Sequence, residues 1–164
     1  VGLMIEGRGL EELISAFNKS IHHLVLIGYG PSWTKLEKKT REINNIHVNK
    51  PLDQKNLLMF IKSADVGIFS PFNIRSLSYK FCMPNKIFEY IHAHLPIIVS
   101  SLDEVVTHIN KSKIGWVVNS EEELKKLIIN IKPSQIINKK KNILKVQKNY
   151  TWESQKDKLI SPYL

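Results

Sequence analysis

The chain has 164 residues, which is enough for one globular domain with a sizeable hydrophobic core. Its 24 Lys and Arg residues outnumber its 15 Asp and Glu residues, and the net charge of +9 favours anionic partners such as nucleotides, phospholipid headgroups or nucleic acid. The one cysteine, Cys82, excludes an intrachain disulfide framework, and no run of about 18 apolar residues is present that could span a membrane.

Short apolar strands alternate with amphipathic helices through residues 1–132. Because residues 2–5 resemble the end of a strand already under way and the chain begins at Val1, we expect a fragment whose N-terminal part is absent. Asp53 and Ser120 are the expected N-caps of two helices. Expected strands cover residues 23–27, 46–48, 66–69, 97–99 and 114–118, and expected helices cover residues 10–17, 33–43, 54–64, 84–92, 104–109 and 121–131. This alternation predicts an α/β fold, a doubly wound domain with a parallel sheet.

A different pattern begins at Pro133. Residues 133–164 place apolar side chains among many lysines, and we expect one or two helices that lie outside the sheet. The run of Lys139, Lys140 and Lys141 is typical of a solvated helix face, and it would also suit contact with anionic lipid. The sequence therefore divides into a binding domain over residues 1–132 and a helical tail over residues 133–164.

The strongest combination of signals lies in residues 83–101. Pro84 suits the first turn of a helix, where its missing N–H is no loss, and Pro96 prevents the helix from continuing. A polar loop, residues 70–83, precedes this helix, and such a loop beside a parallel sheet is a place where an anionic ligand binds. Glu89 lies early in the helix, where it could accept hydrogen bonds from a sugar hydroxyl. A solvent-facing glutamate without a function is the alternative.

Two pairs of glycines mark places where the backbone could approach a ligand. Gly28 and Gly30 follow a predicted strand, but the third glycine of the dinucleotide fingerprint is missing, and we interpret them mainly as a tight turn between strand and helix. Gly7 and Gly9 flank Arg8, whose guanidinium at a helix start could bind two phosphate oxygens. An exposed arginine at a turn is the alternative interpretation.

Other chemistries lack support in the sequence. His92 and His94 are two residues apart, which places their rings on different sides of a helix, and neither they nor the pair His22 and His23 have the further ligands of a zinc site. The sequence contains no G-x-S-x-G motif and no helix-turn-helix, zinc-finger or RNA-binding signature. We therefore expect no metal and no nucleic-acid partner.

Five segments, taken in order, resemble the donor domain of family-four-like (group 1) glycosyltransferases of the GT-B fold. In the most specific segment, residues 84–100, a proline, a lysine and a phenylalanine-glutamate-tyrosine run precede a leucine-proline turn and a strand. The other segments are residues 7–14, 24–30, 63–68 and 150–153, so that the resemblance spans nearly the whole chain. It implies a Rossmann-like domain, the C-terminal half of a GT-B fold, with C-terminal helices outside the sheet.

The resemblance also implies a role for individual residues. Glu89 would accept two ribose hydroxyls, and Arg8 would meet the diphosphate and stabilise it as it departs, so that these two are the expected catalytic residues. The helix start at Pro84, with Asn85 and Lys86, would hold the same diphosphate. The expected donor-binding residues are Gly28, Gly30, Val48, Ser78, Pro84, Asn85, Lys86 and Glu89.

Three features depart from the family pattern. Phe81 stands where many members have a second glutamate, and only one of two basic residues near the first strand is present. His94 stands where glycine usually precedes leucine-proline, so that a histidine must adopt the turn without the conformational freedom of glycine.

The function implied by the resemblance is glycosyl transfer from a nucleoside-diphosphate sugar to a polysaccharide or a lipid-linked acceptor. We expect UDP-sugars to be favoured over GDP-sugars, with no further cofactor. Because the acceptor domain of the family would lie N-terminal to this chain, we expect nucleotide binding with little transfer. A cytoplasmic location with peripheral contact to an anionic membrane is expected. The alternative is a non-catalytic basic α/β domain that binds nucleic acid or a phosphorylated partner.

Overall fold

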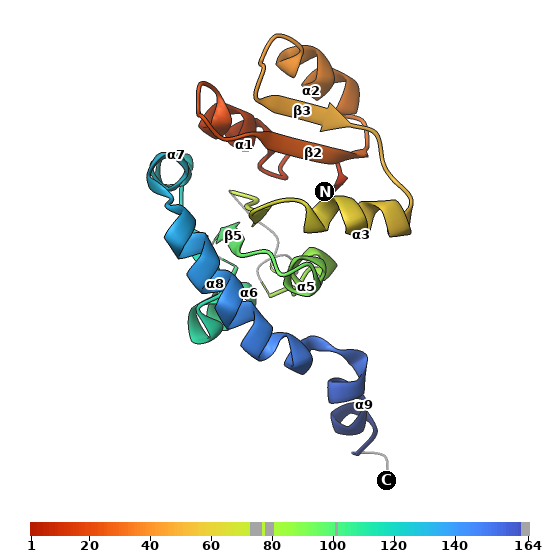
Figure 1. Ribbon diagram of the computed structural model, residues 1–164. Helices are drawn as coiled ribbons and strands as arrows, with labels where there is room; N and C mark the ends of the chain where they lie inside the picture. Colours follow the sequence, from red (N-terminus) through yellow and green to blue (C-terminus); the bar gives the residue numbers. More distant parts are fainter. Residues whose placement is uncertain (73–76, 78–80, 101, 162–164) are drawn as a thin grey trace.

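The computed structural model describes residues 1–72, 77, 81–100 and 102–161. Strands and helices alternate as far as α7, and a helical tail follows (Figure 1). The strands are β1 (Gly2–Leu3), β2 (Leu24–Tyr29), β3 (Ile46–Asn49), β4 (Gly67–Phe69), β5 (Ile97–Ser100) and β6 (Gly115–Val118). The helices are α1 (Leu10–Phe17), α2 (Trp33–Thr40), α3 (Gln54–Lys62), α5 (Asn85–His92), α6 (Asp103–Ser112), α7 (Glu121–Asn130), α8 (Pro133–Val146), the 3-10 helix η1 (Gln147–Tyr150) and α9 (Trp152–Ile160).

The described strands all run parallel, and the α/β fold is confirmed. They form two three-stranded ladders, with strand orders β1-β2-β3 and β4-β5-β6. The sequence predicted a parallel sheet. In the described residues, the strands form two separate ladders, and the short strands β1 and β4, of two and three residues, each form an edge of one ladder. Helices α1 and α7 pack together and join the two ladders. The architecture is therefore doubly wound and Rossmann-like.

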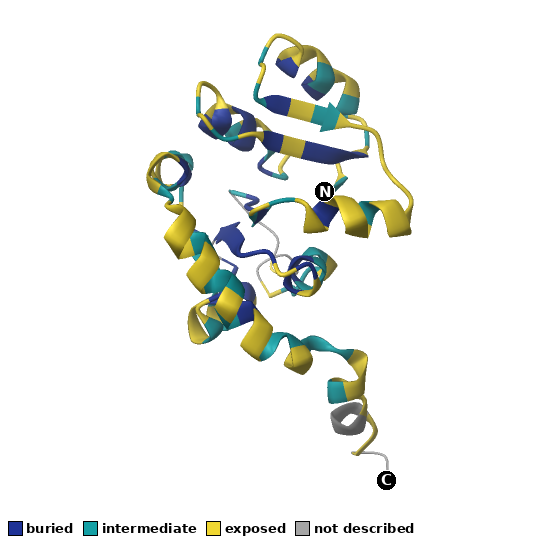
Figure 2. Cartoon of the chain, viewed as in Figure 1, coloured by how far each residue is buried: buried dark blue, intermediate teal, exposed yellow. Residues whose placement is uncertain are grey.

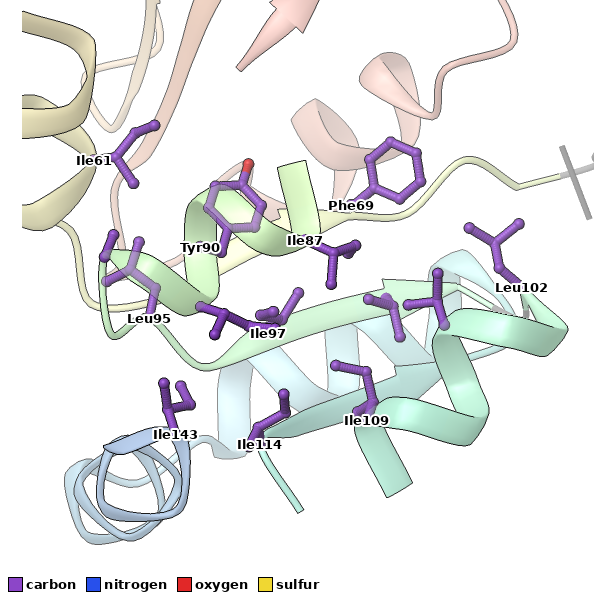
Figure 3. Packing of buried hydrophobic residues seen from close by; sticks show 14 residues of the cluster. Ile61, Phe69, Ile87, Tyr90, Leu95, Ile97, Leu102, Ile109, Ile114 and Ile143 are labelled. Atoms are coloured by element: carbon purple, nitrogen blue, oxygen red, sulfur yellow. The ribbon is translucent and has the colours of Figure 1, made fainter. Parts of the chain in front are cut away.

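Two hydrophobic clusters cover opposite faces of the strands. Alternate residues of β5 point to opposite sides, since Ile97 and Val99 belong to one cluster and Ile98 to the other. The first cluster packs α3, α5, α6 and α8 onto the strands (Figure 3). The second packs α1, α2 and α7. Because β5 is covered on both faces, its uninterrupted run of apolar residues is explained.

Strand β2 runs two residues further than expected and includes Gly28. The interpretation of Gly28 as part of a tight turn is wrong, because Gly28 is buried within the strand and pairs with Gly2 of β1. A Cβ atom on Gly28 would overlap the carbonyl oxygen of Gly2, so that glycine is required by the close approach of two backbones. Gly30 does lie in the turn after β2, with a φ of 142°.

Local sequence signals fix several helix ends. The Asp53 side chain accepts a hydrogen bond from the Asn56 amide at 3.0 Å, and both predicted N-caps are confirmed, since Ser120 caps α7 in the same way. Pro84 is the residue before α5 rather than its first helical residue. His94 adopts a φ of 59° after α5, which is the left-handed conformation that glycine would adopt there.

The tail begins packed against the domain and ends away from it (Figure 1). Ile143 of α8 is fully buried in the first cluster, and the Asn142 side chain donates a hydrogen bond to the Lys113 carbonyl at 3.1 Å. Much of the remaining surface of α8 and η1 is exposed (Figure 2). No helix among the described residues has the length and apolar character needed to cross a bilayer.

Candidate functional site

The carboxyl ends of β1 and β4 bring two loops into contact. Gly9 precedes α1 with a φ of 72°, and a Cβ atom there would overlap the carbonyl oxygen of Ser70, the first residue after β4. The Leu13 amide donates to the Gly9 carbonyl at 3.0 Å and so starts the helix directly behind this contact. In open α/β folds, ligands bind at the carboxyl ends of the strands, which makes this junction the candidate site.

Arg8 lies at this junction, half-buried between its two flanking glycines. Burial raises the pKa of the Cys82 thiol, and the positive charge of Arg8 acts in the opposite direction. Because a charge has this effect only from nearby, Arg8 lies close to the segment that leads into α5. Arg8 thus directly precedes α1 in the sequence, and its charge acts on Cys82 in the segment before α5.

Helix α5 presents its N-terminal turn to the same edge. Pro84 is extended, with φ −66° and ψ 142°, and its carbonyl accepts a hydrogen bond from the Ile87 amide at 3.0 Å. The amides of Asn85 and Lys86 belong to the first turn, where the helix itself supplies no acceptor. These amides and the positive end of the helix dipole suit a phosphate or another anion.

Buried side chains fix the orientation of α5. Ile87, Tyr90 and Ile91 are buried in the first cluster. The Tyr90 ring lies against Gly67 of β4, where a Cβ atom would collide with it, and its hydroxyl donates to the Ile68 carbonyl at 3.3 Å. Burial is the main cause that raises the pKa of Tyr90, with a smaller contribution from Glu89. These contacts hold α5 against β4 and set the direction of its remaining faces.

Lys86 and Glu89 lie on a face of α5 that adjoins β1. They are three residues apart and so are neighbours on the helix surface. The Lys86 side chain crosses Gly2, because a Cβ atom built on Gly2 would collide with its Cε and Nζ atoms. Lys86 and Glu89 also act electrostatically, with opposite sign, on the position of Val1, which directly precedes β1. The charges of Lys86 and Glu89 therefore both act at the start of β1.

Gly30 and Val48 lie at the carboxyl ends of β2 and β3. A Cβ atom on Gly30 would overlap the Met4 carbonyl oxygen, which also accepts a hydrogen bond from the Ser32 amide at 3.1 Å. The Val48 side chain packs against the second cluster, so that only its backbone is available to a ligand. Ser78, which the sequence places in the donor site, lies outside the described residues.

A separate hollow of about 310 Å³ lies between the starts of α1 and α2. It shares Gly7 and Gly9 with the junction but is lined by Glu6, Glu11 and Glu12. Lys35 spans it and pairs with Glu11 at 2.8 Å. Because three carboxylates would repel a diphosphate, we do not assign the anionic part of a ligand to this hollow.

The predicted histidine pairs make other contacts. His94 Nε2 lies 2.6 Å from the Gln147 side-chain oxygen, and His92 Nε2 lies 3.1 Å from the Tyr150 carbonyl. Within the described ranges, no three His, Cys, Asp or Glu side chains gather as metal ligands. Among the residues that the structure describes, Arg8 and Lys86 are the cationic side chains that we consider at the junction.

Two residues that support the junction, Gly2 and Tyr90, were not predicted from the sequence. Gly2 gives Lys86 its path across β1, and Tyr90 holds α5 in place. A glycine near a strand end does signal a close approach of backbones, and this signal could have identified Gly2. Nothing local to Tyr90 distinguishes it from an ordinary core residue.

The comparisons with known proteins identify a family and several structures with the same fold. The family model described as "Glucosyltransferase 3-like, C-terminal domain" matches residues 6–152. No curated protein is similar in sequence.

Solved structures of glycosyltransferases share the fold. WaaG, a glycosyltransferase involved in lipopolysaccharide biosynthesis, matches 90% of this chain and 42% of its own, with 15% identity and a TM-score of 0.69. An α,α-trehalose-phosphate synthase (UDP-forming) from Burkholderia vietnamiensis matches 98% of this chain and 42% of its own, with 13% identity and a TM-score of 0.68.

The C-terminal domain of the glycosyl transferase group 1 family protein LpcC from Francisella tularensis matches 97% of this chain and 83% of its own, with 15% identity and a TM-score of 0.61. The chain spans under half the length of WaaG and of the synthase, and nearly all of a structure that consists of the C-terminal domain alone. It has the fold of the C-terminal half of GT-B glycosyltransferases, and it belongs to the glucosyltransferase 3-like C-terminal domain family.

Proposed function

We propose that the junction of β1, the Arg8 loop and α5 binds the nucleoside diphosphate of a nucleotide-sugar donor. The observation that carries this proposal is the placement of Lys86 and Glu89 on one face of α5 beside β1, with Arg8 before α1 and near enough to act on Cys82 electrostatically. Two cationic side chains and the first-turn amides suit a diphosphate, and one carboxylate suits a pair of hydroxyls.

In this proposal each group has a distinct part in glycosyl transfer. Glu89 accepts hydrogen bonds from the two ribose hydroxyls and so orients the nucleotide. When the bond from the sugar carbon to the diphosphate oxygen breaks, negative charge develops on the leaving diphosphate. Arg8, Lys86 and the amides of Asn85 and Lys86 stabilise that charge from fixed positions. The sugar passes to a hydroxyl of a saccharide or lipid-linked acceptor.

UDP is the nucleotide that we propose first. The resemblance to group 1 glycosyltransferases favours it, and one of the similar structures is that of a UDP-forming synthase. Gly30 and the backbone at Val48 lie at the carboxyl ends of β2 and β3, and we propose that the base lies against them.

Calorimetric titration with UDP and GDP tests the proposal. Wild-type protein should bind one of them saturably, and Glu89→Ala should weaken that binding about tenfold or more, since a hydrogen bond to a charged group contributes about 1.5–3 kcal/mol. Glu42→Ala removes an exposed glutamate from the chain after α2 and is the matched control.

A nucleotide without the 2′-hydroxyl makes the test specific to the ribose. Wild-type protein should bind 2′-deoxy-UDP less tightly than UDP, whereas Glu89→Ala should bind the two equally. A Glu89→Ala variant that still distinguishes the two nucleotides would show that the carboxylate does not contact the ribose. Failure of the wild-type protein to bind any nucleoside diphosphate would overturn the proposal.

A further inference from the structure

The positive charge of this protein is concentrated in one segment. Residues 124–152 contain eight of the 24 basic residues and none of the 15 acidic residues. The rest of the chain is nearly balanced, with sixteen basic and fifteen acidic residues. Solubility alone does not require basic residues to be grouped apart from acidic ones, since elsewhere in this protein basic and acidic side chains form ion pairs. Lys35 of α2 and Glu11 of α1 lie 2.8 Å apart, and Arg41 and Glu37 at the end of α2 lie 3.4 Å apart.

Contacts on one side of α8 determine which side faces outward. Ile143 is fully buried, and Lys139 Nζ donates to the Gly115 carbonyl at 2.6 Å while lying 4.6 Å from the centre of the Trp116 ring. Lys140 lies 4.0 Å from Asp65. These residues attach α8 to the edge strand β6 and to the chain before β4, so that the opposite side is left to solvent.

The outward side of α8 combines apolar and cationic side chains. Ile137 and Leu144 are 54% and 53% exposed, although they are large aliphatic residues. They are seven residues apart and therefore lie on the same side of the helix. Lys141, Lys145 and Lys148 are exposed beside them, and within the described residues no ion pair engages these three lysines.

This combination distinguishes between two anionic partners. A nucleic-acid backbone would contact the lysines but would offer nothing to Ile137 and Leu144. The surface of a bilayer accepts both kinds of side chain, because apolar residues enter the acyl boundary while lysines extend their ammonium groups toward the headgroups. We propose that the outward side of α8 and η1, defined by Ile137, Lys141, Leu144 and Lys145 of α8 and Lys148 of η1, binds the surface of a membrane that contains anionic phospholipid.

The proposal goes beyond nucleotide binding, because α8 contributes none of the donor-site residues. It can therefore fail while nucleotide binding holds, and the reverse is also true. In the proposed arrangement, α8 lies parallel to the membrane surface on the headgroups, and β6 lies on the side of α8 that faces away from the membrane. The orientation of the whole domain relative to the membrane is then fixed.

Co-sedimentation with lipid vesicles tests the electrostatic part. The protein should bind vesicles of phosphatidylcholine with about 30% phosphatidylglycerol and should not bind phosphatidylcholine alone. The triple change Lys141→Gln, Lys145→Gln and Lys148→Gln should weaken binding on the order of a hundredfold. The change Lys38→Gln, Lys55→Gln and Lys62→Gln removes the same charge from exposed positions on α2 and α3 and should change binding much less.

A second variant tests the apolar part. Ile137→Ser with Leu144→Ser leaves the net charge unchanged and should weaken vesicle binding about tenfold or more, also at low ionic strength, since the lost contribution is apolar. Unchanged thermal melting would show that each variant is folded, and an unchanged nucleotide titration would show that the donor site is intact. Two outcomes would overturn the proposal: no binding of the wild-type protein to anionic vesicles, or binding to nucleic acid that depends on the lysines but not on Ile137 and Leu144.

Discussion

The Lys86 side chain lies directly across Gly2, in the space that a side chain at this position of β1 would need. Gly2→Ala would place a methyl group where the Cε and Nζ atoms of Lys86 now lie, and it would also strain a backbone with a φ of 123°. We expect a loss of about 1–2 kcal/mol of stability and a weaker affinity for UDP. Lys86→Met should reduce the affinity for UDP but not stability, and thermal melting with calorimetry would separate the two effects.

The proposed contact of Arg8 with the diphosphate predicts a selective loss of affinity. Arg8→Ala should weaken binding of UDP about tenfold or more while changing the affinity for uridine little, since hydrogen bonds to charged groups contribute about 1.5–3 kcal/mol. Arg41→Ala removes an exposed arginine that pairs with Glu37, and it serves as the control. Equal losses for UDP and uridine would contradict the assignment of Arg8 to the phosphates.

Gly28 and Gly7 are glycines for different reasons: a side chain at Gly28 would lack space, whereas one at Gly7 would strain the backbone. A Cβ atom on Gly28 would overlap the Gly2 carbonyl, whereas one on Gly7 would meet nothing within 4 Å, although Gly7 has a φ of 78°. Gly7→Ala should therefore cost about 1–2 kcal/mol from backbone conformation alone. Gly28→Ala should cost at least as much, and it should also weaken nucleotide binding by displacing β1. Urea denaturation of both variants provides the measurement.

Because the hydroxyl of Tyr90 is buried, we expect the protein to lose stability at alkaline pH. Burial holds the pKa of the folded-state hydroxyl above its value of about 10 in an unfolded chain. The unfolded state therefore loses this proton first, and the contribution of Tyr90 to stability is fully present below about pH 10 and is lost above it. Tyr90→Phe should be less stable at neutral pH by about 0.5–1.5 kcal/mol, because the hydrogen bond to Ile68 is lost. Its melting temperature should fall less than that of the wild-type protein between pH 8 and about pH 11.

Much of the fold and part of the site could be predicted because their signals are local. The caps at Asp53 and Ser120, the β-branched strand before Ser100 and the helix that begins after Pro84 each depend on a few adjacent residues. His94 was expected to adopt the turn of a glycine, and its φ of 59° confirms this.

The errors and omissions concern contacts between distant parts of the chain. Gly28 follows a strand and precedes a second glycine, which is typical of a turn, and only its pairing with Gly2 shows that it serves the packing of two strands. The path of Lys86 across β1 depends on the position of α5, which Tyr90 fixes through β4. The outward side of α8 depends likewise on contacts of Lys139 and Ile143 with distant residues, so that its lysine run alone could not define it.

The two ends of α5 are held by different parts of the chain. Its C-terminal end is bonded to the tail through His92 with Tyr150 and through His94 with Gln147, while its first turn faces the proposed diphosphate site. Between these ends, Ile87, Tyr90 and Ile91 hold the helix against β4. The tail therefore gives a second attachment to the helix whose first turn faces the proposed site, and loss of the two histidine contacts should loosen that helix at the end away from the phosphates.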